Sequence, residues 1–75
     1  MKLPILSSKE VVEVLREKGF NMTRQSGSHM IFVKHDATGK ITVVVPKHRE
    51  LAKDTLLNII AQSKMSKEEF LKLLK

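Results

Sequence analysis

The sequence predicts an α+β fold in which a helix, a three-stranded antiparallel sheet, a second helix and a short C-terminal helix follow one another. Three observations support this prediction. An amphipathic segment opens the chain, three extended segments separated by short turns fill its middle, and two segments with helical apolar spacing complete it. With only 75 residues, the helices can cover one face of the sheet and leave the other open.

The first helix is predicted over residues 9–18. Its apolar positions form one stripe, made of Val11, Val12 and Leu15. Ser7 and Glu10 have the spacing of a capping box, in which each side chain accepts from the backbone amide of the other. Gly19 is expected to end the helix, because glycine adopts the left-handed backbone of a helix C-terminus at little cost.

The middle of the chain is predicted to form an antiparallel meander. Strands are expected at residues 21–26, 29–34 and 41–45, and the last two are rich in β-branched residues. Gly27-Ser28 marks the first turn, residues 36–39 mark the second, and Pro46 ends the third strand.

Side chains of the central strand alternate between two faces of the sheet. One face would hold His29, Ile31 and Val33, and the other Met30, Phe32 and Lys34. Both sets contain apolar residues, so the alternation leaves open which face is buried. Phe20, Phe32 and Phe70 could stack on bases, but their positions within apolar stretches favour packing in the core.

A second helix is predicted over residues 52–63, with its apolar face made of Leu56, Ile59 and Ile60. Ser66 and Glu69 repeat the capping-box spacing and are expected to open a short helix. A helix, a three-stranded antiparallel sheet and a helix are the arrangement of double-stranded-RNA-binding domains. Those domains recognise RNA by its shape, through phosphates and 2′-hydroxyls.

The charge of the chain favours a polyanionic partner. The net charge is +6, and each third of the sequence carries two more basic than acidic residues, so any basic patch must be assembled by folding. The absence of cysteine excludes disulfides, thiolate metal sites and cysteine nucleophiles. No segment has the length of a signal peptide or a membrane span, so we expect one domain over residues 1–75, cytoplasmic and without membrane contact.

The candidates for chemistry are three histidines, since imidazole titrates near neutral pH. Their spacing and the scattered acids suggest no metal site, and no cofactor motif is present. RNA supplies its own nucleophile, so one histidine and nearby cations could cut it. His29 follows a turn and opens a strand, where a rigid sheet would hold it exposed, although composition alone favours a strand histidine that only packs. His35 is expected to be solvated, and His48, in the basic run 47–49, could contact phosphate or be a solvated loop residue.

The chain resembles the HicA family of toxins from bacterial toxin–antitoxin pairs. The matching pieces, in order, are Leu3-Pro4, Leu15 to Phe20, Arg24 to His29, Val45 to His48, Glu50-Leu51, Thr55-Leu56, Ile59-Ile60 and Met65 to Phe70. The resemblance implies a fold like that of double-stranded-RNA-binding domains, mRNA cleavage that blocks translation, and a HicB-type antitoxin that covers the active site. It places the essential histidine at His29, with Gly27 and Ser28 as the turn that aims it. The resemblance defines no RNA-contacting residue firmly, and we expect these contacts at Arg24, Lys47 and His48.

Two positions depart from the family pattern. Asp54 stands where many relatives have glycine, and an acidic residue early in a helix is compatible with the helix dipole. Ser63-Lys64 stands where Ala-Gly often closes the main helix. Without glycine a left-handed cap costs roughly 1 kcal/mol, so this corner is predicted to be built differently.

The leading hypothesis is therefore a metal-independent endoribonuclease that cuts mRNA through His29. A second hypothesis is a non-catalytic module that binds double-stranded RNA, which would bind duplexes in a salt-sensitive way without cutting them. A third is a protein-interaction domain whose positive charge is incidental. The residues alone do not separate these three.

Overall fold

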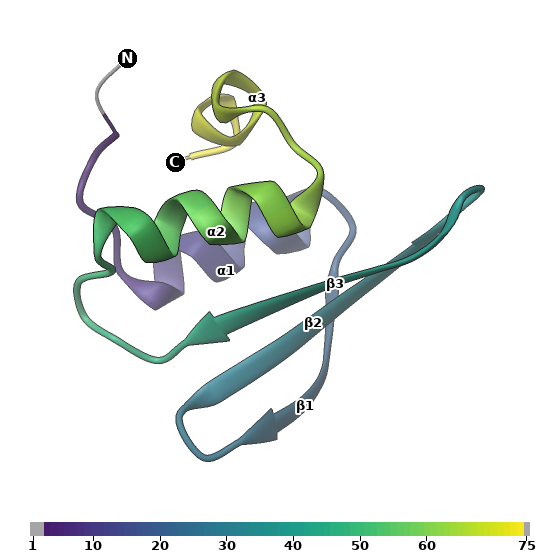
Figure 1. Ribbon diagram of the computed structural model, residues 1–75, viewed down its shortest axis with the longest axis horizontal. Coiled ribbons are helices and arrows are strands. Elements are labelled where there is room, and N and C mark those ends of the chain that lie inside the picture. Colours follow the sequence, from purple (N-terminus) through teal and green to yellow (C-terminus); the bar gives the residue numbers. More distant parts are fainter. Residues whose placement is uncertain (1–2, 75) are drawn as a thin grey trace.

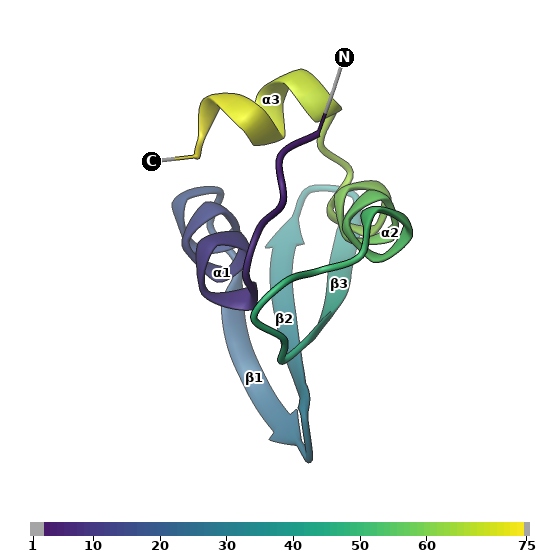
Figure 2. The same ribbon diagram turned by 90° about the vertical axis from the view of Figure 1, so that its left-hand side faces the viewer.

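Two helices lie side by side on one face of a three-stranded sheet, and a third helix covers them from the side away from the sheet (Figures 1 and 2). The computed structural model describes residues 3–74. Its elements are α1 (Ser8–Glu17), β1 (Asn21–Ser26), β2 (His29–Asp36), β3 (Gly39–Pro46), α2 (Lys53–Ser63) and α3 (Lys67–Lys72). The predicted order and the α+β class are confirmed, with boundaries that differ by one or two residues at most ends.

The sheet has the spatial order β1-β2-β3 and is antiparallel throughout. The central strand pairs with β3 from His29 opposite Pro46 to Asp36 opposite Gly39, without interruption. Its pairing with β1 shifts between Met22 and Arg24, where β1 holds one residue more than β2. Such a bulge increases the local twist, and it lies on the strand whose residues are all exposed.

The open question of which sheet face is buried is answered by β2 and β3 together. Phe32 pairs with Val43, and both side chains are completely buried. Met30 pairs with Val45 on the same face and packs against the core. The face of Phe32 therefore supports the helices, and the face of His29 stays uncovered by them. The three phenylalanines are all in the core, as predicted, so none is available for stacking on a base.

The start of α1 follows the predicted capping box. The Ser7 side chain accepts from the Glu10 amide at 3.2 Å, and the Glu10 carboxylate accepts from the Ser7 amide at 3.0 Å. At the other end, Gly19 has a φ of 103°, a conformation that other residues adopt only under strain. The chain then enters β1 with Phe20 buried beneath the helices.

The residue that follows α2 has a left-handed backbone although it is not glycine. The prediction that the chain would end this helix in another way was therefore wrong. Lys64 has a φ of 66°. The preceding Ser63 is buried, and its hydroxyl donates to the Ile60 carbonyl at 2.6 Å and accepts from the Met65 amide at 3.3 Å. These bonds offset part of the cost of a left-handed lysine.

Of the two hydrogen bonds predicted for the second capping box, only the one accepted by the Ser66 side chain forms. Ser66 accepts from the Glu69 amide at 3.1 Å, but the Glu69 carboxylate forms an ion pair with Lys18 on α1 instead of returning to Ser66. The hydrogen bond from Lys18 lowers the pKa of Glu69 below its ordinary value. The ion pair joins α3 to α1, and Phe70 inserts beneath α3 into the core.

Candidate functional site

His29 is the first residue of β2 and is exposed to solvent. Its strand partners are Ser26 in β1 and Pro46 in β3, so its backbone is held on both sides. The two-residue turn before it begins with Gly27 at a φ of 58°, as in hairpin turns of type II′, which need glycine at this position. The sheet thus fixes the backbone of an exposed histidine, as predicted for a residue placed just after a turn.

The turn that precedes His29 is hydrogen-bonded to the loop that follows β3. The Lys47 amide donates to the Ser28 carbonyl at 2.7 Å, which extends the antiparallel ladder one step beyond the strand ends. This bond brings together two segments that the sequence singled out separately, the Gly27-Ser28 turn and the basic run 47–49. They form one end of the sheet.

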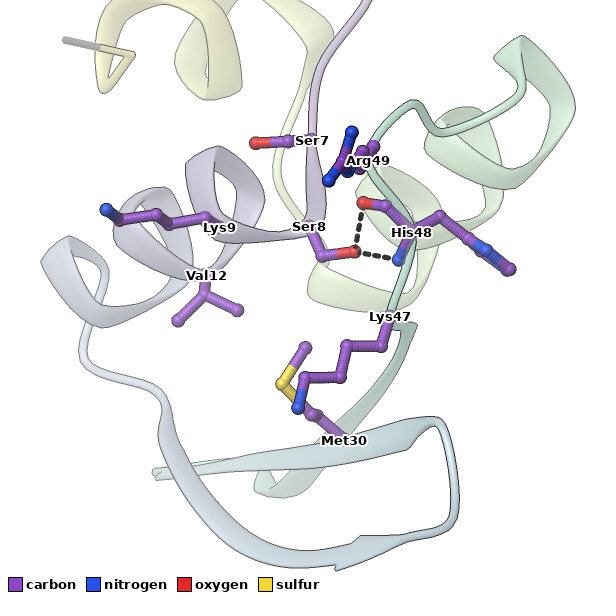
Figure 3. A pocket seen from close by; sticks show the side chains of 8 residues that line it. All are labelled: Ser7, Ser8, Lys9, Val12, Met30, Lys47, His48 and Arg49. Carbon is purple, nitrogen blue, oxygen red and sulfur yellow. Dashed lines mark hydrogen bonds between the residues drawn. The ribbon is translucent and has the colours of Figure 1, made fainter.

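Ser8, at the first position of α1, anchors the same loop to the helix. The side chain is buried, and its hydroxyl accepts from the His48 amide at 2.6 Å. Its single proton lies within reach of two carbonyls, at 2.6 Å from Pro46 and 2.8 Å from His48. The Ser8 amide also donates to the His48 carbonyl at 3.0 Å. These contacts between two short segments hold the backbone of the loop in place, and Figure 3 shows those between the Ser8 hydroxyl and His48.

A pocket of about 580 Å³ lies between the start of α1 and this loop. Its lining consists of Ser7, Ser8, Lys9, Val12, Met30, Lys47, His48 and Arg49. Figure 3 shows the Lys47 side chain extended beside Met30, whereas the His48 ring points away from Lys47 and Met30. Two apolar side chains and three permanent cations surround the space, and no carboxylate is among the lining residues.

The predicted site residues divide between the two faces of the sheet. Lys47 lines the pocket on the helix side, beside Met30, which was not a predicted site residue. His29 alternates with Met30 and therefore belongs to the open face, together with Ile31 and its partner Arg24 in β1. His29 and Lys47 thus occupy the same end of the sheet but flank it from opposite sides.

Ser8 and the pocket were missed by sequence reasoning. Ser8 stands next to the capping residue Ser7, and nothing in its neighbours indicates a partner forty residues away. The one available signal was the Ser-Ser pair at a helix start, where a cap needs only a single serine. Met30 was likewise assigned only to a strand, because its pocket is completed by α1 and the loop after β3.

Within residues 3–74, no three or more His, Asp or Glu side chains lie close enough to hold a metal ion. In the same part of the chain no helix is both long enough and apolar enough to cross a membrane.

Comparison with known proteins identifies the family. Residues 8–65 match the family model of the HicA toxin of bacterial toxin–antitoxin systems, and this match includes α1, the whole sheet and α2. A comparison with curated proteins finds no match. Since the family model covers most of the chain, including the His29 turn and the loop that it contacts, the protein belongs to the HicA toxin family.

Proposed function

We propose that this HicA-family chain is an endoribonuclease that cuts mRNA in the cytoplasm, blocks translation, and is neutralised by a HicB-type antitoxin covering His29. The observation that supports it most is the placement of His29. The side chain is exposed on a backbone held by two strands and a glycine turn, next to a loop rich in cations. A group that must meet a phosphodiester from solvent needs both exposure and a fixed position.

In the proposed reaction, the RNA supplies the attacking group. A base removes the proton from a 2′-hydroxyl, and the 2′-oxygen forms a bond to the adjacent phosphorus. The bond from phosphorus to the 5′-oxygen breaks, and that oxygen takes up a proton from an acid. The products are a 2′,3′-cyclic phosphate and a 5′-hydroxyl. His29 acts as the base or the acid, because imidazole exchanges a proton near neutral pH.

Negative charge grows on the phosphate oxygens during this attack, and nearby cations stabilise it. Arg24 lies on the same sheet face as His29, and Lys47 lies at the same sheet end. We assign Arg24, on the face of His29, to the reacting phosphate, and Lys47, on the opposite face, and His48 in the adjoining loop to neighbouring phosphates of the RNA. Gly27 and Ser28 serve by directing the backbone at His29.

The test is incubation of the purified chain with a long mRNA in the presence of a metal chelator, beside His29→Ala. We expect the wild-type chain to cut in chelator and to leave 2′,3′-cyclic phosphate ends, and the variant to leave the RNA intact. Cleavage that stops in chelator would contradict the metal-independent mechanism. Equal cleavage by His29→Ala would contradict the role of His29. Salt-sensitive duplex binding without any cleavage would replace the enzyme with an RNA-binding module.

The antitoxin is tested with the protein encoded beside this chain. Co-expression should yield a stable complex that no longer cuts RNA, because the bound partner covers His29. The control is a complex assembled with His29→Ala, which should form equally well if the histidine is covered rather than required for binding. Continued cleavage by the assembled complex would contradict a neutralising partner.

A further inference from the structure

We infer that the pocket between α1 and the loop after β3 binds one nucleotide of the RNA, with its base against Met30 and Val12 and its phosphate on Lys47. This inference rests on the proposed function and adds a substrate subsite to it. The subsite lies on the helix side of the sheet end, opposite the face of His29.

The size of the pocket fits a small molecule. Its volume of about 580 Å³ lies in the middle of the range of roughly 300–1,000 Å³ that small-ligand sites occupy. Val12 and Met30 form its apolar surface, and the thioether of Met30 is a soft, adaptable contact for an aromatic ring. Because all three phenylalanines are in the core, Met30 is the best-placed side chain here for contact with a base.

The charge of the lining selects an anion. Lys9, Lys47 and Arg49 stand around an apolar centre, and no Asp or Glu lines the pocket. A nucleotide joins a flat, weakly polar ring to a phosphate, which is the combination that this lining complements. Lys47 extends beside Met30, so one ligand can touch both (Figure 3).

A peptide of the antitoxin is a less suitable occupant. Peptide grooves present a row of apolar anchors or an unpaired strand edge. This pocket offers two apolar side chains, and at the neighbouring strand ends the Lys47 amide is already bonded to the Ser28 carbonyl. A single ring with one anionic group uses the available contacts more fully.

The pocket is built before a ligand arrives. Ser8 is buried and ties the backbone of Pro46 and His48 to α1, so the loop that presents Lys47 needs little ordering on binding. Preorganisation of this kind lowers the entropic cost of binding. The bond between Lys47 and Ser28 also links the pocket to the turn before His29, so a nucleotide held here lies close along the RNA to the reacting phosphate.

The test is an NMR titration of the full chain carrying ¹³C-labelled methionine methyl groups. Adenosine monophosphate is compared with adenosine and with inorganic phosphate. We expect the monophosphate to shift the Met30 signal saturably, adenosine to shift it more weakly, and phosphate to shift it least. Met65 in the core and Met22 on the exposed strand β1 report on non-specific effects and should not move.

A matched pair of lysine variants tests the phosphate contact. Lys47→Gln should weaken binding of the monophosphate by about five- to tenfold and leave adenosine binding almost unchanged. Lys40→Gln removes an exposed charge at the far end of β3 and should change neither by more than about twofold. An unchanged Met65 signal in both variants shows that the core remains folded.

The outcomes separate this inference from the proposed function. If adenosine monophosphate does not shift the Met30 signal, or if phosphate shifts it equally, the nucleotide subsite is overturned even if the chain cuts RNA. A Met30 signal that moves only with an acidic antitoxin peptide overturns it in favour of a protein-binding groove. If the monophosphate shifts the Met30 signal saturably but the chain cuts no RNA, the nucleotide subsite is supported and the endoribonuclease activity is contradicted.

Discussion

The central strand β2 carries a histidine near each end, and the two ends differ in what surrounds them. His29 and His35 lie on the same strand, their side chains face the same side of the sheet, and both are exposed. His29 directly follows a two-residue hairpin turn that contains Gly27, and His35 lies one residue before a two-residue hairpin turn that borders Gly39. By residue type and local structure they form a matched pair.

Among residues 3–74, hydrogen bonds join the turn at the His29 end to α1 by way of the loop after β3, and no such bonds are found for the turn at the His35 end. The turn at the His29 end accepts a hydrogen bond from Lys47, and the loop of Lys47 is tied to α1 through Ser8. The His35 end projects beyond the helices (Figure 1). Its turn is held by local bonds alone, in which Asp36 accepts from the Thr38 amide at 2.8 Å and from the Thr38 hydroxyl at 2.6 Å. The comparison teaches that tertiary contacts, rather than residue type or exposure, distinguish a candidate active-site histidine from a solvated one.

The largest expected effect separates the two histidines directly. His29→Ala should reduce mRNA cleavage by about 10²–10⁴-fold, the range for loss of one acid–base group. His35→Ala should stay within about twofold of wild type, because that side chain has no contact with the pocket end. Rates are measured on one RNA at one pH. Equal losses in the two variants would remove the distinction between the ends.

The two glycines extend the comparison to the turns. A Cβ atom added at Gly27 or Gly39 would have no other atom within 4 Å. Each alanine substitution therefore destabilises the fold only through backbone strain, at φ values of 58° and 130°. We expect losses in unfolding free energy of about 1–2 kcal/mol at Gly27 and about 1–3 kcal/mol at Gly39. Cleavage below the unfolding transition should fall only for Gly27→Ala. A loss of cleavage in Gly39→Ala would show that the turn at the His35 end also matters.

Substitution of Ser8 tests whether RNA cleavage requires the loop after β3 to be anchored to α1. Ser8→Ala removes the buried hydroxyl that accepts from the His48 amide and lies within reach of two loop carbonyls, which should lower the unfolding free energy by about 1–3 kcal/mol. Ser66→Ala removes the cap of α3 and should cost about 1 kcal/mol without touching the loop. Amide exchange at His48 should accelerate in the first variant only, and RNA cleavage should decrease with it. Unchanged exchange at His48 would contradict the anchoring role.

The smallest effect concerns acid at the His35 end. The side-chain hydrogen bond from Thr38 lowers the pKa of Asp36 below its ordinary 3.8. The folded chain therefore binds fewer protons here than the unfolded chain, so this contribution is present above pH 3.8 and is lost as the pH falls through the folded-state pKa. An NMR titration of Asp36 should give a midpoint below 3.8, and Thr38→Ala should return it toward 3.8. An Asp36 midpoint that is unchanged in Thr38→Ala would show that the Thr38 hydrogen bond does not lower this pKa.

Much of the fold could be predicted because its signals are local. Ser7 and Glu10 cap α1 by contacts three residues apart, and Gly19 ends it, all within one short segment. The predictions failed where distant residues compete for a side chain. Glu69 pairs with Lys18, fifty-one positions away in the chain, instead of completing its own capping box. Lys64 is left-handed because Ser63 and the packed corner support it.

The candidate site divides in the same way. Residue type and the position after Gly27-Ser28 single out His29, and the family match covers it. The pocket could not be predicted, since its walls come from α1, β2 and the loop after β3. Nor could the alternation in β2 assign Met30 to the pocket face, because both faces of the strand contain apolar residues.

By itself the sequence determined the elements, their order, the three titratable imidazoles and the basic charge, because these depend on residue type and on neighbours a few positions away. Only the tertiary structure decided which face of β2 is buried, which of two similar histidines adjoins the helices, and where a pocket forms. Each of these depends on contacts between segments far apart in the chain, such as Ser8 with His48 and Ser28 with Lys47. Those pairings arise only when the sheet and the helices pack together.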